Sequence, residues 1–252
     1  MSHFVKAGRI CWRVMILTVL VILSLAPVQS WVSAQNPSAR GWVVRTIHTS
    51  ELGVAQPGGL AFSAPTSTFI VLDANGNSTL LTMDEDNAGT QVLPEAQGNA
   101  INAAFDNGKG SLFVLNHGRG EIAEIRSDGN GLPNPSAPPA RSAIQAFGIK
   151  DPQGITFSSE DGRLFVLDAG SAQIVSVAPH PTLSFDASEA IRSNNIERIS
   201  LRRLGAGTFR GIAFDPSSGY LYVSQPDQKR LYELTQAGEL VSTIDLASFG
   251  ID

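Results

Sequence analysis

Residues 151–168 read DPQGITFSSEDGRLFVLD, and three other stretches repeat the pattern: PGGLAFSAPTSTFIVLD from Pro57, NAINAAFDNGKGSLFVLN from Asn99 and FRGIAFDPSSGYLYVSQ from Phe209. In each stretch a phenylalanine is followed nine residues later by a valine, with Gly, Ser, Asp and Asn between them. The pairs are Phe62/Val71, Phe105/Val114, Phe157/Val166 and Phe214/Val223. Constant spacing around a variable turn predicts two strands of one β-hairpin in each stretch.

A third and a fourth strand are expected after each hairpin. The third contains an apolar pair at spacing three: Leu80/Met83, Ile122/Ile125, Ile174/Val177 and Leu231/Leu234. Fourth strands are expected at Gln91–Leu93, Ser142–Phe147, Ile196–Leu201 and Leu240–Leu246. The four phenylalanines lie 43, 52 and 57 residues apart, which is the period of four-stranded propeller blades with two loop insertions. We therefore predict an all-β propeller with antiparallel blades at about 57–94, 99–148, 151–202 and 209–247.

The pattern PxGIxFxxxxGxLFVLDxxxxQIxxV, as it stands in residues 152–177, resembles the NHL-type repeat. It is also similar to the related propellers of the senescence-marker-protein and gluconolactonase class. The resemblance extends over about Trp42 to Asp252 and implies blades arranged around a central channel. It does not select a function, because the same kind of blade supports ligand binding, lactone hydrolysis and scaffolding.

The numbers of predicted outer and inner strands do not match, so the predicted blades do not close into a ring. The segment WVVRTIH, Trp42 to His48, is similar to a fourth strand, so the chain has five outer strands but only four inner triplets. We expect a truncated piece of a longer propeller, and the resemblance implies six blades. Closure with four blades is the alternative.

The first 34 residues have the layout of a signal peptide. A positive start without acidic residues precedes thirteen uncharged residues, Val14–Ala26, and small residues at Val32 and Ala34 precede a cleavable bond. Cleavage after Ala34 leaves residues 35–252 as the propeller and predicts Sec-type export to the cell envelope or the medium. An uncleaved membrane anchor is the alternative, although thirteen helical residues span only about 20 Å.

The channel positions argue against catalysis. In the lactonase-type relatives, the resemblance implies a channel metal held by Glu, Asp and Asn, with the Asn just before the glycine of later inner strands. Here those positions hold Gly58, Ile101, Gln153 and Arg210. We therefore expect no enzymatic activity and no cofactor. A divalent cation held in part by missing blades remains an alternative, because such a site needs several oxygen ligands.

Two sets of polar residues are candidates for contact with a ligand. Asp73, Asn116, Asp168 and Gln225 each lie two residues after the second-strand valine, where they could form a ring near one mouth of the channel. The alternative is that they bond backbone N–H groups of the adjacent turns. Calcium-loop spacing gives a second set, Asp73, Asn75, Asn77 and Asp84, but Ser78 stands where such a loop needs glycine.

The net charge of the chain limits the classes of partner that it can bind. Residues 35–252 contain 15 basic and 23 acidic side chains, a net charge of −8, which excludes an unassisted grip on nucleic acid. We expect an exported, non-enzymatic propeller whose loop face recognises an extracytoplasmic protein, glycan or small ligand, with membrane contact only through an uncleaved leader. The alternatives are a metal-dependent lactonase or esterase and a repeat module of a larger secreted calcium-binding or adhesive protein.

Overall fold

The computed structural model describes residues 48–249 except 74–78, 84–87, 93–99, 128, 130, 135 and 180–194. The strands of this part form four antiparallel sheets of four strands each, and it contains no α-helix. The all-β prediction is thereby confirmed. No helix in the described residues is both long enough and apolar enough to cross a bilayer. The predicted leader and the predicted strand residues before His48 lie outside these ranges.

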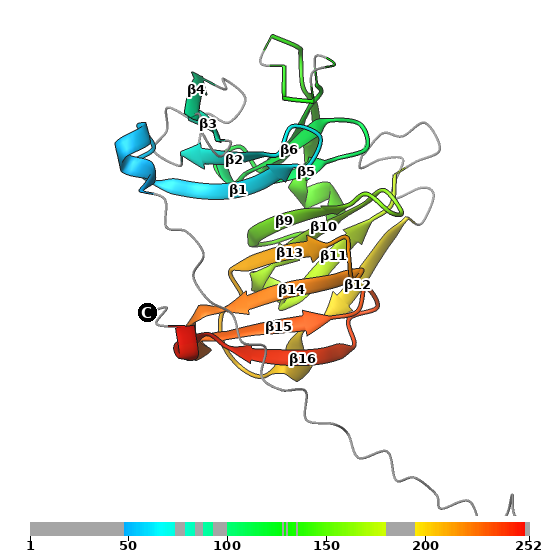
Figure 1. Ribbon diagram of the computed structural model, residues 1–252. Helices are drawn as coiled ribbons and strands as arrows, with labels where there is room; N and C mark the ends of the chain where they lie inside the picture. Colours follow the sequence, from blue (N-terminus) through cyan, green and yellow to red (C-terminus); the bar gives the residue numbers. More distant parts are fainter. Residues whose placement is uncertain are drawn as a thin grey trace, which may run out of the picture. The chain divides into compact units, whose positions relative to one another are not determined.

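Each sheet is one blade, and its strand order follows the chain (Figure 1). Blade 1 contains β1 (Pro57–Ser63), β2 (Thr68–Asp73), β3 (Thr79–Met83) and β4 (Ala88–Val92). Blade 2 contains β5 (Ala100–Asp106), β6 (Ser111–Asn116), β7 (Glu121–Ile125) and β8 (Ala140–Ala143). Blade 3 contains β9 (Pro152–Ser158), β10 (Arg163–Asp168), β11 (Gln173–Val177) and β12 (Ile196–Ser200). Blade 4 contains β13 (Gly211–Asp215), β14 (Tyr220–Gln225), β15 (Arg230–Leu234) and β16 (Leu240–Asp245).

Short 3-10 turns connect these elements: η1 (Thr49–Leu52), η3 (Ile144–Phe147), η4 (Ala169–Ser171), η5 (Arg202–Leu204), η6 (Pro226–Gln228) and η7 (Leu246–Phe249). The turn η3 replaces the second half of a strand that the sequence predicts to continue to Phe147. This turn buries both Ile144 and Phe147 in the core between blades 2 and 3. In a strand, residues three positions apart lie on opposite faces, so a strand could bury only one of the two in this core. Gly148 then ends the turn in the left-handed region, with φ of 73°.

The first strand of each blade packs against the first strand of the next, in the order β1, β5, β9, β13. Glycines permit this close approach. A Cβ atom on Gly59 would lie 2.6 Å from the Cα of Asn102, and one on Gly154 would lie 3.2 Å from the backbone nitrogen of Ile212. A side chain on Gly59 would push blades 1 and 2 apart, and one on Gly154 would require Ile212 to shift by a few tenths of an ångström.

The repeat places equivalent residues on equivalent faces. We call the face that carries the motif phenylalanine the leading face of a blade, and the opposite one its trailing face. In blades 2, 3 and 4 the leading face is buried against the trailing face of the preceding blade. Between blades 2 and 3, for example, the rings of Phe113 and Phe157 stack with their centroids 5.3 Å apart. These interfaces form the hydrophobic core.

Blade 1 has a leading face that no described blade covers. Leu60, Phe62 and Phe69 are 59%, 44% and 41% exposed, and the two phenylalanine rings contact each other at 5.0 Å. Toward one end of this face the described residues Val71 and Asp73 are buried, and Val54 packs on Val71. The four described blades therefore do not close into a ring, and they form part of a propeller.

Candidate ligand-binding cleft

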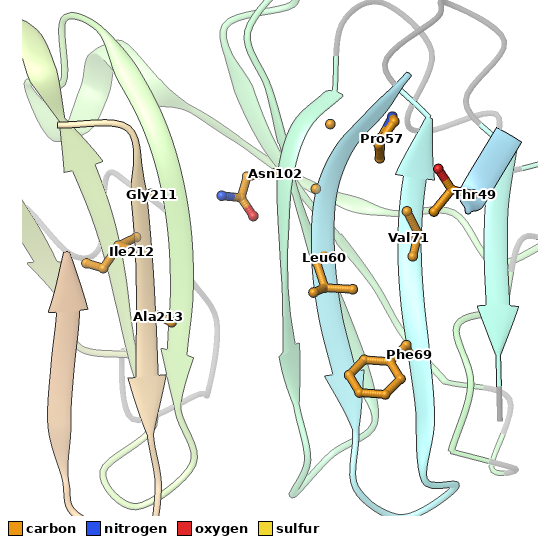
Figure 2. A pocket seen from close by; sticks show the side chains of 11 residues that line it. Thr49, Pro57, Leu60, Phe69, Val71, Asn102, Gly211, Ile212 and Ala213 are labelled. Atoms are coloured by element: carbon orange, nitrogen blue, oxygen red, sulfur yellow. The ribbon is translucent and has the colours of Figure 1, made fainter. Parts of the chain in front are cut away.

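A cleft of about 590 Å³ lies between β1 and β2 on one side and β13 on the other (Figure 2). Its volume is within the range of pockets that hold small molecules, roughly 300–1,000 Å³. Leucine, phenylalanine, valine and isoleucine side chains form most of its walls, together with glycine backbone. None of the eleven described residues that line the cleft is ionisable.

Asn102 of β5 is the lining residue that carries an amide. The equivalent positions of β1, β9 and β13 are Gly59, Gly154 and Gly211, so blade 2 alone has a side chain there. The amide nitrogen of Asn102 lies 3.3 Å from the place that a Cβ atom on Gly154 would occupy. Figure 2 shows this side chain between the strands of blade 1 and those of blade 4. The missing side chain of Gly154 thus provides the room for Asn102.

Two of the predicted channel positions are joined by a polar chain. Nη1 of Arg210 donates to Oε1 of Gln153 at 3.0 Å, and Nε2 of Gln153 donates to Oδ1 of Asp151 at 2.7 Å. Arg210 is exposed, and it precedes Gly211, which lines the cleft. Of the other two positions, Gly58 lines the cleft and Ile101 packs against the core between blades 2 and 3.

The predicted ring residues Asp73, Asn116, Asp168 and Gln225 end the second strand of their blades and are at most 5% exposed. Three of them bond nearby groups. Oδ1 of Asp73 accepts from the backbone N–H of Gln56, Oδ1 of Asn116 accepts from that of Arg119, and Nε2 of Gln225 donates to the carbonyl of Ala206. Such bonds fix the turns around each hairpin. None of the four lines the cleft, and their contact with a ligand stays a prediction.

Asp168 has the best-defined environment of the four. Its Oδ1 accepts backbone N–H groups from Asp151 at 2.9 Å and Lys150 at 3.3 Å, and its Oδ2 accepts Nε2 of Gln173 at 3.1 Å. Burial acts to raise the pKa of Asp168, but these bonds and one from Ser171 favour the carboxylate and together hold the pKa below its usual value. The side chain is therefore ionised, and its hydrogen bonds hold the backbone segment that leads into β9.

The calcium-loop prediction falls largely outside the described chain. Asp73 is at the end of β2, whereas Asn75, Asn77 and Asp84 lie beyond the described ranges. Within those ranges no group of three or more His, Cys, Asp or Glu side chains is placed to hold a metal ion.

The cleft itself and the role of Asn102 escaped the sequence prediction. That prediction looked for polar side chains that recur at one position of the repeat or at calcium-loop spacing, and Asn102 belongs to neither set. The sequence did contain one signal, because Asn102 stands where the aligned repeats have glycine.

No protein-family model and no curated protein matches the chain. Solved structures do match. Virginiamycin B lyase from Staphylococcus aureus shares 12% identity at a TM-score of 0.47 and is matched over 74% of this chain and 54% of its own. A putative 6-phosphogluconolactonase from Bacteroides uniformis shares 14% identity at a TM-score of 0.49, over 75% and 56%. A chain of a nidogen/laminin complex shares 12% at 0.47, over 76% and 81%.

These neighbours are β-propeller proteins, and they include both enzymes and binding proteins. At such low identity the likeness concerns the fold alone. The chain spans about half the length of the lyase and the lactonase-like protein.

Proposed function

We propose that the chain is an exported, non-enzymatic β-propeller that binds an extracytoplasmic ligand at the channel and its loop face. The observation that carries this proposal is the cleft, whose described lining residues combine mostly apolar side chains with the hydroxyl of Thr49, the amide of Asn102 and no ionisable group. A site of this composition can bind a molecule and orient it. It offers no carboxylate, imidazole or amine as a general acid or base, so binding fits better than hydrolysis.

The size of the cleft favours a small ligand over the protein or glycan that the loop face could also accept. A volume of about 590 Å³ suits one compact molecule. Protein recognition usually needs about 800 Å² of surface on each partner. We also assign the repeat to the NHL-type and gluconolactonase-like class, on the pattern in residues 152–177.

Ligand-induced stabilisation tests the proposal. The full chain would be screened against neutral small molecules by thermal unfolding, together with Leu60→Glu and Leu240→Glu. These leucines are similarly exposed, at 59% and 50%, but only Leu60 lines the cleft. A true ligand raises the Tm of the wild type and of Leu240→Glu, and it fails to raise that of Leu60→Glu, because a charge in the cleft opposes an apolar ligand.

Two outcomes would contradict the proposal. One is equal stabilisation of both variants, which would place the ligand elsewhere. The other is turnover of a lactone panel that requires a divalent metal and disappears with a chelator, because this would restore the hydrolase alternative.

Export has its own test. The proposal expects the chain, expressed with its leader in a secreting bacterial host, to appear outside the cytoplasm with Gln35 as its first residue. Terminal sequencing would read this directly. A chain that retains residues 1–34 would support the membrane-anchor alternative.

A further inference from the structure

Asn102 departs from the repeat at a position where a side chain is costly. Glycine stands at this place in β1 and β9 because Cβ atoms there would press on the adjacent backbone, at 2.6 Å for Gly59 and 3.2 Å for Gly154. Blade 2 carries a branched amide instead, and the side chain extends over Gly154 into the cleft.

The orientation of the amide is fixed by its own backbone. The N–H of Ala103 donates to Oδ1 of Asn102 at 2.7 Å. Because a backbone N–H can only donate, the atom that faces it is the oxygen, and Nδ2 is the atom left to face the cleft. Within the described part of the chain this nitrogen has no acceptor, so it is available as a donor to a molecule in the cleft.

The side chains that line the cleft determine the chemistry of the rest of the ligand. Leu60, Phe69 and Ile212 line the cleft, and no lining residue carries a charge that could neutralise an ionic group. A charged group placed against these apolar walls would lose part of its hydration without compensation. A donor in apolar surroundings, in contrast, strongly discriminates between molecules that can and cannot accept its hydrogen bond.

We propose that Asn102 is the specificity-determining donor of this cleft, which takes a neutral, largely apolar molecule with a carbonyl-type acceptor. The inference rests on the proposed binding function and names the ligand class. The bound acceptor receives a hydrogen bond from Nδ2 of Asn102, while Oδ1 keeps its bond from Ala103.

A matched pair of fluorescent probes tests the inference. The first is 6-propionyl-2-(dimethylamino)naphthalene, which has one ketone on an apolar body. The second is 6-propyl-2-(dimethylamino)naphthalene, in which a methylene replaces the carbonyl. Fluorescence titration of the full chain is expected to show about tenfold tighter binding of the ketone, the ratio that corresponds to one satisfied hydrogen bond.

Asn102→Asp removes the donor and keeps an oxygen for the N–H of Ala103. This variant is expected to lose the preference for the ketone, with a ratio below about two. Asn102→Gly, which restores the residue of the other blades, should lose it as well and serves as the second variant if the aspartate does not fold. The control is Asn134→Asp, whose Oδ1 likewise accepts a backbone N–H, from Ser136, but which lies on an exposed loop outside the cleft. It should retain the wild-type ratio.

The outcomes separate the two proposals. If the wild type binds neither probe, both the cleft-binding function and this inference are overturned. If the wild type binds both probes equally, or Asn102→Asp and Asn102→Gly keep the ketone preference, the cleft still binds ligands but Asn102 does not select them.

Discussion

The leading faces of blades 1 and 3 carry similar residues in opposite environments. Phe62 and Phe157 occupy the same place in the repeat, yet Phe62 is 44% exposed and Phe157 is 7% exposed. The neighbour makes the difference, because blade 2 covers Phe157 with its trailing face, and no described blade covers Phe62. In a repeat protein, stability therefore resides in the interfaces between units as much as in the units.

Removing the buried ring should have the largest effect. Phe157→Ala deletes a side chain that stacks on Phe113 in the core between blades 2 and 3. We expect a loss of about 3–4 kcal/mol in the free energy of unfolding, the usual cost of emptying a phenylalanine site. Urea denaturation of the full chain would measure it. A loss below about 1 kcal/mol would show that blade 3 is held mainly by its own sheet.

An intermediate effect is expected at Asp168, the carboxylate that clamps the segment entering β9. Asp168→Asn keeps the size but loses charged hydrogen bonds to Asp151 and Lys150, at an expected cost of about 1.5 kcal/mol at pH 7. Because the folded-state pKa is lowered, this contribution is present above the pKa of the unfolded chain and is lost as the pH falls through the folded value.

The difference in the free energy of unfolding between the wild type and Asp168→Asn should therefore disappear at acidic pH. Denaturation midpoints measured from pH 7 down to about pH 2 would show two curves that converge. A constant gap over this range would mean that the variant acts through geometry and that the charge of Asp168 contributes little.

The smallest effect is expected at the exposed ring. Phe62→Ala removes a side chain that contacts Phe69 and otherwise faces outward, so the unfolding free energy should fall by less than about 1 kcal/mol. The same denaturation series checks it. A loss equal to that of Phe157→Ala would indicate that something covers this face in solution, and the contrast between the two blades would disappear.

The hairpins could be predicted from sequence because their signals are local. The nine-residue spacing of Phe62 and Val71 brings Phe62 opposite Phe69 and Leu60 opposite Val71 in the observed register. The end of β8 could not be predicted in this way. Ile144 and Phe147 read as strand residues, and only the space between blades 2 and 3 makes a turn the better way to bury both.

The cleft was harder to predict from the sequence than the hairpins or the end of β8. Leu60 and Ile212 line it together although about 150 residues separate them in the chain. No periodicity encodes such a meeting, which depends on how the blades are stacked. The unusual amide at Asn102 was visible in the alignment of repeats, but its meaning required the backbone around it.

The strand order within the blades also bears on how the chain acquires its structure. Every strand in the described part of the chain pairs with the strand that precedes or follows it. Pairing between neighbouring strands loses less loop entropy than pairing between strands far apart in the chain, so each sheet can begin to form on its own. Each sheet can form once its own four strands have been synthesised, but its exposed apolar face gains cover only when the next blade arrives. The interval between successive blades is thus the period in which the growing chain is most prone to aggregate.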